Sequence, residues 1–189
     1  MTKKQAKAKF ILYLKERNIN FLERLSDGKS CIFMVFRGYE RCPDKALECS
    51  IFFYDTYMEA RVYYTANASK WISEKANELS NLYRVLNYIQ ANVWPFVHDN
   101  IGGRLYSSPL LNGFRLYITE DGNYDLTTTI LINYNAFEFS TLEIADYLTV
   151  EMPALMDSLS IPIFFVLFEK ITPEESIALI KRDVLKTVG

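Results

Sequence analysis

Four strand-like runs follow one another early in the chain, and they constrain the fold more than any other feature of the sequence. β-Branched and aromatic residues dominate the first two runs, and Asp27-Gly28 between them is typical of a hairpin turn. A connection of four residues separates the other two runs. The runs are residues 19–25, 30–37, 47–54 and 59–65. Together they predict a four-stranded antiparallel meander.

Two stretches with a helical repeat flank the meander and predict helices that pack on it. Residues 2–17 carry an apolar stripe from Ala6 to Leu14, with lysines on the other face. Residues 69–93 keep apolar side chains at helical spacing until Pro95 stops the pattern. We therefore expect a short amphipathic helix before the meander and one long helix after it.

The second half of the chain predicts another hairpin and further helices. Residues 113–120 and 123–132 flank the turn Asp121-Gly122, and the second run alternates between an apolar and a threonine-rich face. Ser140 and Glu143 have the spacing of a capping box and start a helix that runs to Leu159. The expected fold class is therefore α+β, an antiparallel meander packed with helices.

Two prolines and one short apolar run leave the end of this pattern open. Pro153 either bends the helix that starts at Ser140 or breaks it. Residues 161–169 are too short for periodicity to separate a strand from a helical turn. Thr172 followed by Pro173 is the expected start of a last helix.

Composition and charge narrow the class of protein. Half of the 189 residues are apolar, which suits one well-buried domain over residues 1–189. The formal net charge of −2 lacks the excess of lysine and arginine that binds a nucleic-acid backbone. No run reaches the ~20 apolar residues that cross a bilayer, and Pro162 interrupts the longest candidate. We expect neither nucleic acid nor a membrane as a partner.

Cysteine usage and the first residues predict a cytoplasmic protein. Three cysteines without a CxxC spacing argue against a disulfide framework and against a zinc site. Reduced cytosolic thiols are the simplest interpretation. The lysine-rich start of the chain leads into an amphipathic pattern and lacks the apolar region and cleavage site of an export signal.

Candidate catalytic groups are few. His98 is the only histidine and lies beside Asp99 in a loop, with no nucleophile in a recognisable pattern. Cys42 lies beside Arg41 and Lys45, whose charges would lower its pKa, although no catalytic signature surrounds it. Cys31 and Cys49 lie in apolar strand patterns and are expected to be packing residues.

The remaining motifs support neither catalysis nor a cofactor. Gly102-Gly103 lacks the context of a phosphate-binding loop, and the paired carboxylates Glu120/Asp121 and Glu174/Glu175 suit turns and helix caps. We expect no enzyme, no cofactor and no metal site.

Two features exceed this background. Residues 32–36 and 51–54 are apolar on both faces, whereas an antiparallel strand with one wet face alternates. Either helices of the same chain or a partner must cover the second face. The candidate interaction surface is Phe33, Val35, Phe52, Tyr54 and Tyr63.

The second feature is an uneven distribution of charge. No basic residue lies between Arg115 and Lys170, whereas nine acidic residues do, from Glu120 to Glu169. This acidic half suits a solvated helix face, a basic protein segment, or the lysine-rich first helix of a neighbouring subunit.

Several short motifs, together with the order of elements, carry a resemblance to a known family. They are Leu86-Asn87-Tyr88-Ile89, Phe114-Arg115-Leu116-Tyr117-Ile118, Glu120-Asp121-Gly122, Pro162, Val166-Leu167 and Ile171-Thr172-Pro173-Glu174-Glu175. With these motifs the chain resembles the YbjN family, whose fold is similar to that of type III secretion chaperones. The resemblance implies a small dimerising fold that handles other proteins, and it favours a helix over residues 161–169. It brings no catalytic residues.

Three functional hypotheses follow. The first is a non-enzymatic, chaperone-like or regulatory homodimer that binds an unknown polypeptide through an apolar groove bordered by acid. The second is a small-molecule sensor in which the aromatic strands and residues 96–112 line a pocket. The third is an unrecognised enzyme that uses Cys42 or His98.

Overall fold

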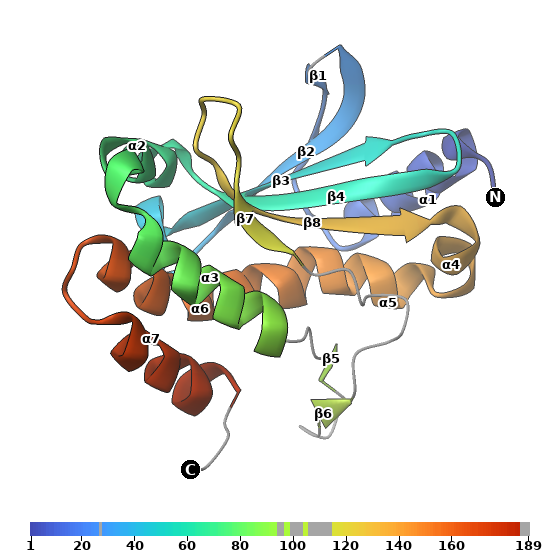
Figure 1. The fold of residues 1–189 in the computed structure, drawn as a ribbon. Coiled ribbons are helices and arrows are strands. Elements are labelled where there is room, and N and C mark those ends of the chain that lie inside the picture. The colour runs from blue at the N-terminus through green and yellow to red at the C-terminus, as the bar shows by residue number, and fades with distance from the viewer. Residues whose placement is uncertain (27, 94–96, 99–103, 106–114, 186–189) are drawn as a thin grey trace.

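In the computed structural model, the chain forms a six-stranded antiparallel sheet with helices packed on one of its faces (Figure 1). The structure describes residues 1–26, 28–93, 97–98, 104–105 and 115–185. The strands of the sheet are β1 (Leu22–Ser26), β2 (Lys29–Arg37), β3 (Ala46–Phe53), β4 (Tyr57–Tyr64), β7 (Leu116–Ile118) and β8 (Leu126–Asn133). A separate two-stranded pairing joins β5 (Val97–His98) to β6 (Arg104–Leu105). The α+β class is confirmed.

The predicted meander is confirmed, and the second hairpin extends it. Strands β1 to β4 pair in chain order, with Ser26 opposite Lys29 at the first hairpin, where Gly28 has a φ of +72°. β8 then pairs antiparallel with β4, and β7 pairs with the other side of β8. The sheet order is therefore β1-β2-β3-β4-β8-β7. We call the face toward the helices the inner face and the opposite face the outer face.

Seven α-helices make up most of the helical layer. They are α1 (Lys3–Glu16), α2 (Ala66–Glu74), α3 (Ser80–Asn92), α4 (Tyr134–Phe139), α5 (Thr141–Asp146), α6 (Met152–Leu167) and α7 (Pro173–Leu179). Short 3-10 turns at Pro43–Lys45 and Ala76–Glu78, and π-helical turns at Tyr147–Glu151 and Ile180–Val184, complete the described helical structure.

The prediction of one long helix over residues 69–93 is wrong. The structure has α2 and α3 separated by a 3-10 turn, and α2 already begins at Ala66. The break falls in a polar run, where Lys75 ends α2 and its ammonium contacts Glu78 and Glu169. The turn lets α2 and α3 each direct an apolar face into the core, which one straight helix would not do.

The predicted capping box at Ser140 is also wrong. An unpredicted helix, α4, ends at Phe139, and Ser140 joins it directly to α5 without a side-chain cap. The final helix does begin as predicted, because Thr172 and Glu175 form a reciprocal capping box. The Glu175 backbone N–H donates to Thr172 Oγ1 at 3.2 Å, and the Thr172 backbone N–H donates to Glu175 Oε2 at 2.8 Å.

Pro153 deforms the helix without ending it. A proline cannot donate to the preceding turn, and the π-helical turn Tyr147–Glu151 lies directly before it. Residues 161–167 are helical, as the family resemblance favoured, and Glu169 leaves the helix with a φ of +56°.

The joined helical stretch Thr141–Leu167 corrects the argument that no segment of this chain is long and apolar enough to cross a bilayer. By length and composition alone it is apolar enough to cross a membrane, which the separate segments did not indicate. More than half of the stretch is buried within the chain, as in the core helix of a globular fold.

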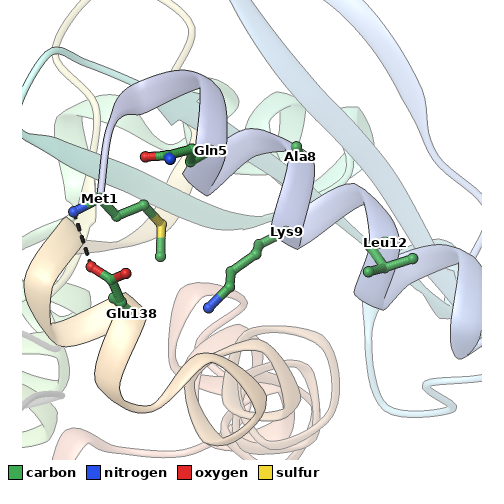
Figure 2. Close-up of a pocket in the computed structure, with 6 residues that line it drawn as sticks. All are labelled: Met1, Gln5, Ala8, Lys9, Leu12 and Glu138. Atoms are coloured by element: carbon green, nitrogen blue, oxygen red, sulfur yellow. Dashed lines mark hydrogen bonds and ion pairs between the residues drawn. The ribbon is translucent and has the colours of Figure 1, made fainter.

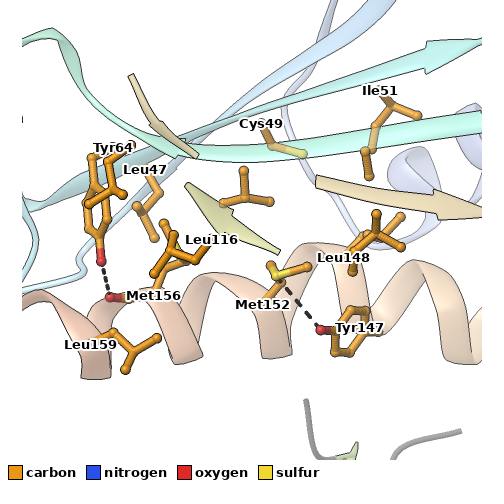
Figure 3. Close-up of a cluster of buried hydrophobic side chains, with 14 of the residues drawn as sticks. Leu47, Cys49, Ile51, Tyr64, Leu116, Tyr147, Leu148, Met152, Met156 and Leu159 are labelled. Atoms are coloured by element: carbon orange, nitrogen blue, oxygen red, sulfur yellow. Dashed lines mark hydrogen bonds between the residues drawn. The ribbon is translucent and has the colours of Figure 1, made fainter. Parts of the chain in front are cut away.

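The core lies between the inner face and α6 (Figure 3). Leu47, Cys49 and Ile51 of β3 face Met152 and Met156 of α6. The backbone groups of α6 also bond to the sheet, since the Tyr64 hydroxyl donates to the Met156 carbonyl at 2.6 Å. One face of the sheet is thus fully buried, and the alternation of strands sends the remaining side chains to the outer face.

Two neighbouring residues of β8 test this division of faces. We expect Ile130→Ala to lower the free energy of unfolding by about 2–5 kcal/mol, because Ile130 is buried on the inner face. Leu131 points to the outer face and is 61% exposed, so Leu131→Ala should change stability by less than about 0.5 kcal/mol. Urea denaturation measures both, and equal losses would contradict the assignment.

Candidate functional site

The structure brings the five predicted interaction residues to the outer face. Phe33, Val35, Phe52 and Tyr63 alternate along β2, β3 and β4 with residues of the core. Tyr54 follows Phe52 at the same spacing, and its hydroxyl donates to Glu59, which lies opposite Phe52, at 3.0 Å. These five residues therefore share one surface, as the alternation of side chains along the strands predicts.

One end of the outer face leaves apolar side chains in solvent. Leu22 of β1 lies opposite Phe33 and is 65% exposed, while Val35 is 38% exposed. The Arg24 guanidinium lies 3.5 Å from the centre of the Phe33 ring, which is half-buried under it. We call Leu22, Phe33 and Val35 the apolar strip.

The centre of the outer face is polar instead. Arg61 donates from Nε to Glu59 at 2.5 Å and lies over the Phe52 ring at 5.1 Å, so Phe52 is buried beneath a charged group. Ser50 and Tyr63 join their hydroxyls at 3.1 Å. The expected apolar groove is therefore reduced to the apolar strip, with Leu131 of β8 as a separate exposed apolar residue, because the strands also direct charged residues to this face.

Burial shifts the ionisation of several groups on this face. It raises the pKa of Glu48, against the opposing effects of Arg24 and of a hydrogen bond from Tyr63. Burial also raises the pKa of Tyr63 and that of Tyr54. Both phenols therefore stay protonated at neutral pH and serve as hydrogen-bonding groups, not as bases.

A small pocket of about 200 Å³ lies on the outer face, and we call it the outer pocket. In Figure 1, β1 and the β7–β8 connection both rise on the side of the sheet that faces away from α6. Hydroxyl, amide and charged groups dominate the lining, with aromatic rings between them. The lining is Ser26, Ser50, Phe52, Arg61, Tyr63, Tyr117, Thr119, Asp121, Asn123, Asp125 and Thr127. The predicted sensor pocket involves residues 96–112, of which 96, 99–103 and 106–112 lie outside the described part of the chain.

A second surface feature lies between α1 and α4, and the sequence did not point to it. An open groove of about 330 Å³ runs along the exposed side of α1. Figure 2 shows Glu138 across from the α1 residues that line it. Phe139, the neighbour of Glu138, is 88% exposed, and Leu12 and Leu142 are exposed as well. The groove is lined by Met1, Gln5, Ala8, Lys9, Leu12 and Glu138. We call it the α1–α4 groove.

The acidic half of the chain meets the first helix of the same chain. The terminal amine of Met1 lies 3.0 Å from a carboxylate oxygen of Glu138, and Arg17 lies 3.4 Å from a carboxylate oxygen of Asp146. The Tyr13 hydroxyl adds a bond to Asp146 at 2.7 Å. Part of the charge asymmetry is therefore satisfied within one chain.

The candidate nucleophile Cys42 is not in the expected environment. It is buried, and its thiol lies 3.3 Å from the Ser160 hydroxyl. Burial raises the pKa of Cys42 to about 12, and the nearby Asp157 carboxylate acts in the same direction. The expectation that Arg41 and Lys45 lower this pKa is wrong, because the thiol points away from solvent into a contact with α6.

The other candidates divide into two groups. Cys31 and Cys49 are buried, which confirms them as packing residues. The side chain of His98, and the whole of Asp99 and Asn100, lie outside the described residues. Within the ranges that the structure describes, no group of histidine, cysteine and carboxylate side chains could hold a metal ion.

Sequence reasoning missed Leu22, Arg24 and Arg61 on the outer face. A signal for Arg61 was present, since it lies two positions before Tyr63 on the same strand. Leu22 could be found only from the hairpin register, which sets it opposite Phe33. Phe139 carried no signal, because the short helix α4 that presents it was not predicted.

The buried thiols lead to a reactivity test. We expect the native protein to resist a thiol-specific reagent such as DTNB at mildly alkaline pH, because burial keeps Cys42 protonated there. The guanidinium-unfolded protein should react at three thiols. A rapidly reacting thiol in the native protein that Cys42→Ala removes would restore Cys42 as a candidate nucleophile.

No protein-family model, no curated protein and no solved structure matches this chain, so the likeness to the YbjN family stays an expectation.

Proposed function

We propose that this protein is a non-enzymatic binding domain that acts as a homodimer and captures a segment of another polypeptide on its outer face. The observation that carries the proposal is the apolar strip, in which Leu22 and Val35 are exposed beside the half-buried Phe33 on a sheet face that the described helices leave uncovered. Contiguous exposed apolar groups of this kind mark interaction surfaces, whereas single ones do not.

The arrangement around the apolar strip favours a polypeptide over a purely apolar ligand. Arg24 and Glu48 lie beside the strip, so a bound segment meets both apolar contacts and charged hydrogen-bonding groups. Interfaces between proteins commonly combine an apolar centre with a polar rim.

The α1–α4 groove is the proposed contact between two copies. Phe139 is the most exposed of the large apolar residues described, and the groove beside it is open enough to receive a side chain. No ion pair within 4.0 Å joins Glu143 or Lys9 to another described residue. The Lys9 ammonium donates to the Thr141 hydroxyl at 3.5 Å and its charge also acts on Glu138. A two-fold axis would bring Lys9 of one copy toward Glu143 of the other, and the same pair would form twice, so the surface is self-complementary.

A photo-crosslinking amino acid at Val35 tests the outer face. In native lysate it should form an adduct with a defined polypeptide, and Leu22→Asp in the same chain should abolish that adduct. Ile161 on α6 is the matched control site, because its exposure of 36% is close to the 38% of Val35. Equal adducts from both sites, or none at Val35, would contradict polypeptide capture there.

Sedimentation of Phe139→Ser tests the homodimer. We expect wild type to sediment as a dimer and the variant to dissociate at least about tenfold more readily, because a central aromatic anchor is lost. Phe168→Ser, at a site 38% exposed on another surface, should leave the dimer intact. A monomeric wild type would refute the homodimer and leave the outer face as a separate question.

A further inference from the structure

The outer pocket has opposite charges at its two ends. Arg61 lies at one end, where its partner across the sheet is Thr129 of β8. Asp121 and Asp125 lie at the other end, on the connection between β7 and β8. Hydroxyl groups and the rings of Tyr63 and Tyr117 line the space between, and Phe52 lies beneath Arg61.

Arg61 is held in place, and its terminal guanidinium nitrogens remain available as hydrogen-bond donors. Glu59 accepts from its Nε, and the guanidinium lies over the Phe52 ring, which limits its motion. The two terminal nitrogens have no hydrogen-bond partner among the residues that the structure describes. A planar guanidinium with both terminal nitrogens free suits a carboxylate, which it binds through two parallel hydrogen bonds.

The acidic end is equally ordered. Asp121 accepts from the backbone N–H of Asn123 at 3.0 Å, and these bonds keep its carboxylate ionised. Asp125 accepts from the Ser69 hydroxyl through one oxygen at 2.6 Å. Two carboxylates against one guanidinium leave the lining with an excess of negative charge, so a ligand that fits it carries a net positive charge.

The spacing of the two ends sets the length of the ligand. Asp125 precedes Thr129 by four positions, which corresponds to about 13 Å along a strand. The Arg61 side chain leans toward Glu59 and so does not shorten this gap, and a ligand the size of glycine does not bridge it. A molecule with a carboxylate at one end and a cation several bonds away does.

We propose that the outer pocket binds a basic α-amino acid, lysine or arginine, with its carboxylate on Arg61 and its side-chain cation on Asp121 and Asp125. Such a ligand carries one carboxylate, one distal cation and a net positive charge, and it is smaller than the drug-sized molecules that fill pockets of about 300–1,000 Å³. The same chemistry occurs in a free amino acid and in the carboxyl-terminal residue of a polypeptide. This inference does not depend on capture of a polypeptide by the apolar strip.

Calorimetric titration of the full chain with matched probes tests the proposal. L-Lysine or L-arginine should bind at up to about 10 mM, an affinity range accessible to a few charged contacts. Norleucine lacks the distal cation and cadaverine lacks the carboxylate, so both should bind at least tenfold more weakly. Nα-Acetyl-L-lysine imitates a carboxyl-terminal lysine. If Nα-acetyl-L-lysine binds as tightly as L-lysine, the natural ligand is the carboxyl-terminal residue of a polypeptide. If it does not bind, the natural ligand is the free amino acid.

Variants separate the two ends of the pocket. Arg61→Gln should lower the affinity for L-lysine by about 10- to 100-fold and leave the weak affinity for cadaverine unchanged. Asp121→Asn lies in an exposed connection, where the change should not disturb folding, and should lower the affinity for L-lysine and for cadaverine. Arg84→Gln, which removes an exposed arginine paired with Glu174, is the control and should change neither. No binding of either basic amino acid, or equal binding of norleucine, would overturn the proposal.

Discussion

The packing of α6 against the inner face of the sheet is the interaction on which the rest of this structure depends. Met152, Met156 and Leu159 are buried there beneath apolar residues of β3 and β4. Burial of apolar surface contributes about 25 cal/mol per Å², and this layer contains many of the largest buried side chains. Because alternate residues of a strand point to opposite sides, burying one face also determines which residues the other face presents.

None of the helices that the structure describes covers the outer face, where charged residues shield the aromatic rings instead. Arg24 covers Phe33, and Arg61 covers Phe52 while Glu59 holds the guanidinium in position. Cation–π contacts of this kind stabilise a ring that would otherwise lie in water. The face is therefore neither a second core surface nor a uniform apolar groove. Its exposed apolar side chains lie in the apolar strip on β1 and β2 and at Leu131 on β8, and Arg61, Asp121 and Asp125 line the outer pocket.

The helical layer adapts to the sheet at positions that propensity alone does not identify. The polar run around Lys75 allows a break, and the break occurs there because α2 and α3 contact different parts of the core. Pro153 removes one backbone donor, yet the helix continues through a π-helical turn because apolar side chains on both sides are buried under the sheet. Tertiary packing outweighs local preference at both places, in opposite directions.

The sequence by itself determined the meander, the second hairpin, the alternation of β8 and the cap at Thr172. Each depends on residues close together in the chain, whose period or turn chemistry is local. It also identified the five aromatic and apolar residues of the outer face. Only the tertiary structure decided that β8 pairs with β4, that Cys42 is buried against Ser160, and that Arg61 and Asp121 line one pocket. These depend on contacts between distant segments, and no local pattern records which distant residue a side chain will meet.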